Sequence, residues 1–144
     1  MGRKRYAMTV AVGILLLAGC GEDAEPTSEA NQLMPQKVRY EVVTSDGVTI
    51  PAGGPVRADV TVATPDGTEQ STVNLPMTSK GGEPGYELAF MPGQFVYVSA
   101  QKGDYRGGIT CRIIVADVDG ANERIISENT STGDHAIATC QGTV

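Results

Sequence analysis

The pattern that most restricts the fold is a strict alternation of apolar and polar residues, which is clearest from Val56 to Thr64. One face of this segment would be apolar and the other polar, as in a strand that covers a core on one side only. The apolar set is Val56, Ala58, Val60 and Val62, and the polar set is Arg57, Asp59 and Thr61. Similar segments bounded by Gly, Pro, Asn and Asp recur along the chain, and helical periodicity is nearly absent. The chain is therefore predicted to be all-β.

Short alternating segments of this kind predict several strands in residues 37–144. We expect strands at 38–42, 48–50, 56–64, 71–75, 86–91, 95–100, 109–118, 124–127 and 135–140. The run Ile109 to Val118 is the most apolar and is expected to form a central strand. Residues 37–144 suffice for one core and are too few for two. The expected fold is an immunoglobulin-like antiparallel β-sandwich of about seven strands. The chain has no Trp, so an antibody-type domain is excluded.

The N-terminal segment has the features of a bacterial lipoprotein signal peptide. Arg3, Lys4 and Arg5 precede an apolar run from Ala7 to Ala18, and the sequence Leu-Ala-Gly before Cys20 matches a lipobox. We expect residues 1–19 to be cleaved and the Cys20 thiol to carry lipid. Two acyl chains suffice for stable anchoring. The alternative is an uncleaved signal anchor. The predicted location is the extracytoplasmic face of the cell membrane, held there by membrane lipid.

Residues 20–36 are predicted to be a disordered acidic tether that begins at lipidated Cys20. Four acidic residues, no basic residue and few apolar ones lie between Gly21 and Gln36. The whole chain has 11 basic and 17 acidic residues, and three of the basic ones lie in the signal peptide. An acidic surface argues against nucleic acid as a partner.

The remaining cysteines, Cys111 and Cys140, form an even pair in an oxidising compartment. Their simplest state is one disulfide. A metal-binding pair and a catalytic thiol are the alternatives.

No catalytic residue, metal site or cofactor is predicted, so the chain is not expected to be an enzyme. His135 follows Asp134 and has Ser127 and Ser131 nearby, but no nucleophile-elbow motif is present. The acidic segment 117–123 resembles a calcium loop, yet Ala121 stands where the EF-hand spacing requires a ligand. A turn at Asp119 and Gly120 explains the same residues.

Two glycine-rich loops are the candidate partner-contact surfaces, since Tyr and Arg are enriched at binding hot spots. The first is Gln101 to Gly108, and the second is Thr78 to Tyr86. The candidate residues are Lys102, Asp104, Tyr105, Arg106 and Tyr86. The alternative is that both loops are merely solvated turns.

The order of motifs resembles the small mycobacterial membrane protein family, MmpS, whose members assist RND-type transporters of the MmpL kind in exporting lipids and siderophores from actinobacteria. The similarity covers nearly all of residues 37–144. The matching segments are VRYEV at 38–42, residues 58–64 before PDG, Leu75 with Pro76, VSAQ at 98–101, ITCRI at 109–113, and STG at 131–133 leading to Cys140. The chain departs from the family in its lipobox, which replaces an N-terminal membrane helix, and in Met77, which replaces an aromatic residue.

The resemblance implies a β-sandwich, a bridge between Cys111 and Cys140, and no catalytic residues. It also implies a non-enzymatic accessory to an RND-type exporter of lipids or siderophores, whose contacts with the transporter run through the exported domain. The alternative is a free-standing cell-surface module that binds a lipid, a peptide or an envelope polymer. The oligomeric state is not predicted.

Overall fold

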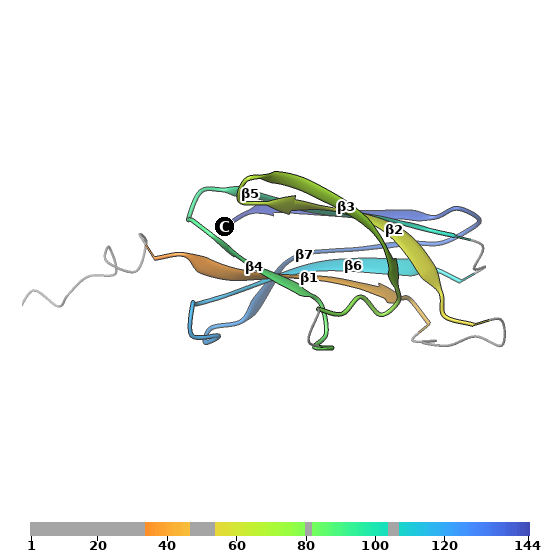
Figure 1. The fold of residues 1–144 in the computed structure, drawn as a ribbon, viewed down its shortest axis with the longest axis horizontal. Coiled ribbons are helices and arrows are strands. Elements are labelled where there is room, and N and C mark those ends of the chain that lie inside the picture. The colour runs from red at the N-terminus through yellow and green to blue at the C-terminus, as the bar shows by residue number, and fades with distance from the viewer. Residues whose placement is uncertain (1–33, 47–53, 80–81, 104–106) are drawn as a thin grey trace, which may run out of the picture.

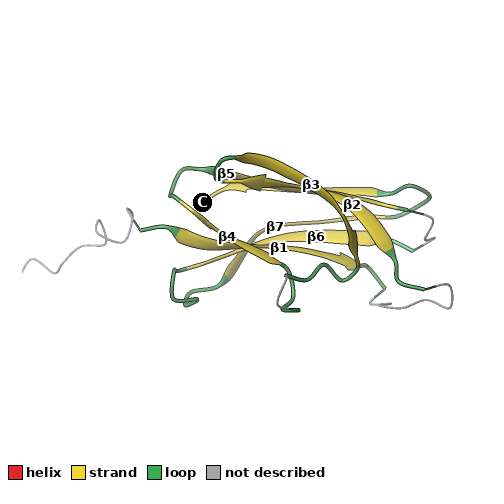
Figure 2. Cartoon of the chain, viewed as in Figure 1, coloured by secondary structure: helices red, strands yellow, loops and turns green. Residues whose placement is uncertain are grey.

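The described residues form eight strands joined by turns. The computed structural model describes residues 34–46, 54–79, 82–103 and 107–144, and none of these residues is helical (Figure 2). The strands are β1 (Gln36–Thr44), β2 (Arg57–Thr64), β3 (Gly67–Asn74), β4 (Tyr86–Phe90), β5 (Phe95–Lys102), β6 (Ile109–Ala116), β7 (Arg124–Ser131) and β8 (Ile137–Thr143). The described part contains no helix of the length and apolar character needed to cross a membrane.

The strands pair antiparallel in two four-stranded sheets that pack face to face (Figure 1). The first sheet has the order β4-β1-β6-β7, and the second has the order β3-β2-β5-β8. The predicted all-β, immunoglobulin-like sandwich is confirmed, with eight strands where about seven were expected. The likeness to immunoglobulin domains is one of architecture, because only β2-β3 and β6-β7 are hairpins of consecutive strands.

The core lies between the sheets and is built by the predicted alternation. Val56, Ala58, Val60 and Val62 are all buried, whereas Arg57 and Asp59 are exposed. The predicted central strand is β6, which pairs with β1 on one side and β7 on the other. Its residues are buried on both faces, apart from the half-buried Arg112. This explains why its sequence is apolar without alternation.

Some predicted strand limits are wrong, and the errors fall mainly on polar segments. β3 begins at Gly67, not Ser71, and β7 continues to Ser131, not Ser127. Both are edge strands whose side chains are mostly exposed, so neither carries an alternating apolar signal. Their place is fixed by backbone pairing with β2 and β6. The expected strand 48–50 lies outside the described residues.

Two covalent or polar links join the sheets through the core. The predicted disulfide is confirmed: Cys111 of β6 is bonded to Cys140 of β8, with 6.1 Å between the Cα atoms. Tyr40 of β1 donates a hydrogen bond of 2.9 Å from its hydroxyl to the carbonyl oxygen of Ala63 in β2. The Tyr40 ring also meets Phe90 edge to face, with 6.3 Å between the ring centroids. Both links cross from one sheet to the other.

Burial of the Tyr40 phenol gives the fold a specific sensitivity to alkaline pH. Burial raises the pKa of Tyr40 to about 12, and the nearby backbone of Tyr97 opposes the shift. A folded-state pKa above the unfolded value of 10.0 means that stability is fully present below pH 10 and is lost as pH rises towards 12. We expect the free energy of unfolding to fall by about 2 to 3 kcal/mol over this range.

Urea titrations between pH 8 and pH 12 would measure this loss. The matched variant is Tyr40→Phe, which we expect to be about 1 kcal/mol less stable at neutral pH, because the Ala63 carbonyl loses its donor. Above pH 10 the variant should lose less stability than the parent protein. Parallel pH profiles for the two proteins would contradict the assignment.

Candidate functional site

The strongest candidate site is the outer face of the β4-β1-β6-β7 sheet, where charged side chains of alternating sign lie next to one another. The outward positions of β1 carry Lys37, Arg39 and Glu41. Backbone register places Arg39 beside Glu87 of β4, and Glu41 beside Arg112 of β6. Opposite charges therefore face each other across neighbouring strands, an arrangement that stabilises the strand pair modestly. We call this set of side chains the charged face.

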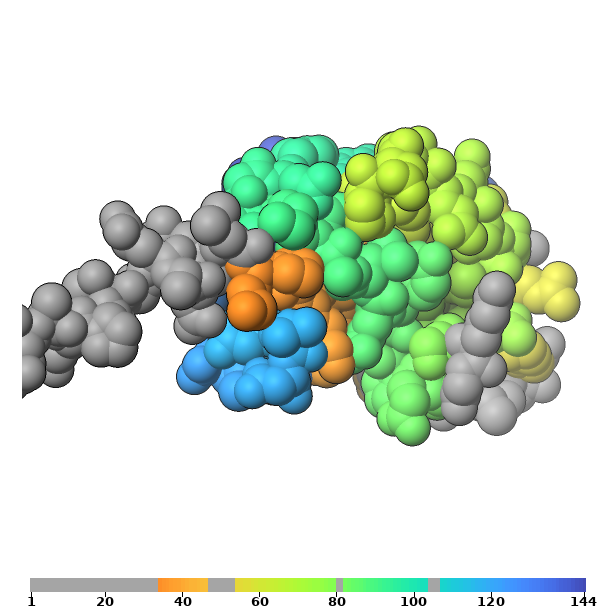
Figure 3. Space-filling model, turned by 60° about the vertical axis from the view of Figure 1, so that its left-hand side comes forward, coloured from red at the N-terminus to blue at the C-terminus, as the bar shows by residue number. Residues whose placement is uncertain are grey.

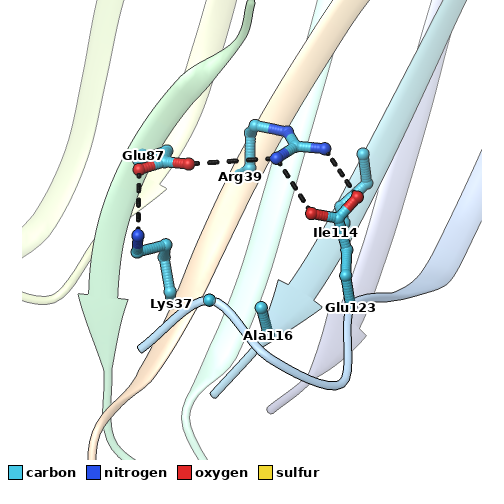
Figure 4. Close-up of a pocket in the computed structure, with 7 residues that line it drawn as sticks. Lys37, Arg39, Glu87, Ile114, Ala116 and Glu123 are labelled. Atoms are coloured by element: carbon cyan, nitrogen blue, oxygen red, sulfur yellow. Dashed lines mark hydrogen bonds and ion pairs between the residues drawn. The ribbon is translucent and has the colours of Figure 1, made fainter. Parts of the chain in front are cut away.

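Arg39 is the centre of the charged face (Figure 4). Its two terminal nitrogens donate to both carboxylate oxygens of Glu123, at 2.8 and 3.1 Å, and its Nε donates to Glu41 at 3.0 Å. Glu87 lies 3.9 Å from the same guanidinium and 3.6 Å from the Lys37 ammonium. The hydrogen bond with Glu123 is the main cause that raises the pKa of Arg39 above its ordinary value. Three carboxylates thus fix the guanidinium in place.

The network continues across the sheet through Arg112. This side chain is ion-paired with Glu128 of β7 and lies 3.9 Å from Glu41. Beneath Arg39 and Glu123, the outward side chains Ile114 and Ala116 form an apolar floor. Their exposed fractions are only 5% and 7%. The charged side chains therefore cover part of the outer face of the sheet. A small pocket of about 100 Å³ remains between them and the sheet (Figure 4).

A larger groove of about 580 Å³ adjoins the charged face at the β4 edge. Its lining combines Arg39, Glu41 and Glu87 with Tyr86, Leu88 and residues 79 and 83–85 of the preceding loop. Tyr86 packs its ring against the core and donates from its hydroxyl to Glu69 of β3 at 3.1 Å. Burial first, and then Glu69, raises the pKa of Tyr86 above its ordinary value. The groove offers carboxylates and one guanidinium to a polar ligand.

The structure describes two of the five residues expected to contact a partner, and they differ in exposure. Tyr86 lines the groove, but it is the first residue of β4 and not a loop residue. The prediction that Lys102 lies in an exposed loop is wrong: β5 extends to Lys102, whose side chain is 2% exposed. It continues the inward row of Val96, Val98 and Ala100. Asp104, Tyr105 and Arg106 lie outside the described residues.

The catalytic alternative gains no geometric support from the described residues. His135 lies in an exposed turn before β8 with a φ of 56°, rather than in the strand. The Ser127 hydroxyl accepts from the backbone amide of Gln141, at 3.3 Å.

Segment 117–123 is the predicted turn between β6 and β7, held by its own side chains. Asp119 accepts from the amide of Ala121, and Asp117 accepts from the Asn122 amide group. Among the described residues, no three His, Cys, Asp or Glu side chains are placed to share a metal ion.

The expected strand 38–42 includes Arg39 and Glu41, but sequence reasoning missed the charged face. The pattern of one strand shows which residues point outward, and it does not show which strands lie beside it. The pairing of β1 with β4 and β6, and the turn that brings Glu123 to Arg39, are tertiary features. The charged residues Lys37, Arg39 and Glu41, at alternate positions of one strand, were the only available signal. No family model, curated protein or solved structure matches this chain.

Proposed function

We propose that the chain is a non-enzymatic docking lipoprotein, anchored through Cys20 on the extracytoplasmic face of the membrane, and that its partner is an RND-type exporter of lipids or siderophores. The observation that carries the docking role is the charged face, with Arg39 held among Glu41, Glu87 and Glu123. The resemblance to the MmpS family supplies the class of partner. The lipobox supplies the location.

The charged face suits recognition better than it suits stability. Ion pairs at a protein surface typically contribute at most about 1 kcal/mol each. The six ion pairs of this face are therefore expected to add little to the stability of the fold. A face of fixed charges instead selects partners of complementary pattern and orients their approach. Arg and Tyr are enriched among residues that dominate binding energies, and here Arg39 and Tyr86 share one groove.

Site-specific photocrosslinking in intact cells tests this proposal. A photoreactive residue replaces Glu83, an exposed residue of the groove, in one strain. In the matched strain it replaces Gln70, an exposed residue of β3 on the other sheet. We expect an adduct with a large membrane transporter from position 83 and little or none from position 70. The measurement is mass spectrometry of the crosslinked band.

If neither crosslinked band contains a transporter, the exporter role is contradicted. Equal adducts from both positions would instead show that the charged face is not the docking surface. Metabolic labelling with a fatty acid checks the anchor separately, because the parent protein should incorporate the label and a Cys20→Ala variant should not.

The second candidate is a free-standing module that binds a peptide or an envelope polymer. The groove favours it, since Glu41, Glu83 and Glu87 would attract cationic groups along an extended ligand. In the same experiment, a polymer or peptide adduct at position 83 without transporter would identify this function.

A further inference from the structure

The end of the sandwich nearest the tether carries an apolar rim. Six large apolar side chains are at least 45% exposed among the described residues, and four of them lie at this end. They are Met34 before β1, Met91 after β4, Phe95 at the start of β5 and Val118 after β6, with exposed fractions of 55%, 45%, 57% and 56%. We call these four residues the tether-end rim. The structure leaves them open to solvent.

Strand register and the two views agree that these residues lie at one end. Gln36 pairs with Phe90, and Lys37 pairs with Ala116, so the start of β1 lies beside the ends of β4 and β6. In Figure 3 the start of β1, the segment after β4 and the turn after β6 form one continuous surface. The described chain begins at this surface (Figure 1).

The rim is held by a firm framework. The turn at residues 91–94 is tied to the C-terminal residue, because Gly93 donates to Val144 at 2.6 Å and Val144 donates to Gln94 at 3.1 Å. The ring of Phe95 stacks on Tyr97 with 6.3 Å between centroids. Val118 borders a hollow of about 230 Å³ that Leu88 and Ala89 also line. The exposed side chains are therefore presented by ordered backbone.

The length of chain before Met34 indicates what covers the rim. Cys20 precedes Met34 by fourteen residues, which can span at most about 50 Å when fully extended. If Cys20 is lipidated, the bilayer is always within that distance of the rim. No other partner is tied to the rim in this way. Short linkers of this kind give effective concentrations in the millimolar range, so a weak affinity of the rim for the bilayer is enough.

We propose that the tether-end rim seats on the bilayer interface and so orients the charged face relative to the membrane. The inference rests on the proposed lipid anchor. Apolar side chains at such a surface bury about 5 to 10 Å into the headgroup and acyl boundary. The neighbouring turn carries Asp117, Asp119 and Glu123, so binding depends on apolar insertion and gains nothing from anionic lipid.

Tryptophan fluorescence tests the rim directly, because the chain contains no Trp. Phe95→Trp places a reporter in the rim, and Ile137→Trp places one in an equally exposed position where β8 begins, at the far end of the sandwich. Both full-length lipidated proteins are reconstituted in phosphatidylcholine vesicles with brominated acyl chains. We expect a blue shift and loss of roughly half the emission for Phe95→Trp, as for a ring at the acyl boundary. Ile137→Trp should be unchanged.

The possible outcomes distinguish failure of the lipid anchor at Cys20 from failure of the tether-end rim as a membrane contact. Intact mass shows whether Cys20 carries lipid, and its absence would overturn the anchor and the rim together. A lipidated protein in which both reporters are equally unquenched would overturn the rim alone. A blue shift without quenching that grows with protein concentration would mean that a second copy covers the rim, and would also overturn it.

Discussion

Replacement of both core cysteines, Cys111→Ala with Cys140→Ala, is expected to lower the free energy of unfolding by about 3 to 4 kcal/mol. The bond closes a loop with a sequence separation of 29, for which the chain-entropy relation gives about 3.6 kcal/mol. It also joins β6 to β8 across the two sheets, so its loss lets these two segments move independently in the unfolded chain. The midpoint of thermal unfolding should fall by roughly 15 °C.

Urea unfolding of the parent and the double variant, each with and without reductant, measures this effect. Reductant should destabilise the parent by about the same amount and leave the double variant unchanged. A double variant within about 1 kcal/mol of the parent would contradict the entropic role of the bond.

The chain's two phenylalanines provide the second large effect and its own control. Phe90→Ala is expected to cost about 3 to 5 kcal/mol, because the ring is 1% exposed and packs edge to face against Tyr40. Phe95→Ala removes the same atoms from a ring that is 57% exposed, and should change stability by no more than about 0.5 kcal/mol.

Denaturant titration of the two variants side by side measures the difference. Because the substitution is identical, effects on the unfolded chain are similar and the contrast reports burial alone. Comparable losses for both variants would mean that Phe95 packs against the domain in solution, against the exposure described above.

The inward rows of the sandwich could be predicted because burial on one face leaves a period-2 signal. β2 was placed within a few residues for this reason, whereas β6 was placed by its continuous apolar run, because both of its faces are buried. The polar half of β7 left no such signal, since its order comes from hydrogen bonds to β6 and not from its own side chains. Backbone pairing is independent of side-chain polarity, so a polar edge strand looks like a loop in the sequence.

The candidate site was harder to predict than the fold. Lys102 was expected in solvent because it lies in the glycine-rich segment 101–108, yet β5 continues two residues beyond Ala100 and places Lys102 on the inner face. The charged face requires the strand order β4-β1-β6-β7, which a single sequence does not contain. Glu123 reaches Arg39 across 84 positions of the chain, a contact that no local pattern reports.

The strand order also has a consequence for the proposed export of the chain. β1 is the first strand, but its partners are β4 and β6, and Tyr40 pairs with Ile113. The pairing of β1 with β6 therefore cannot be completed until residue 116 is available, and pairing between such distant segments is intrinsically slow. A polypeptide threaded through an export channel from its N-terminus would stay extended during transit for this reason. Topology alone would then keep the domain competent for translocation until it folds on the far side.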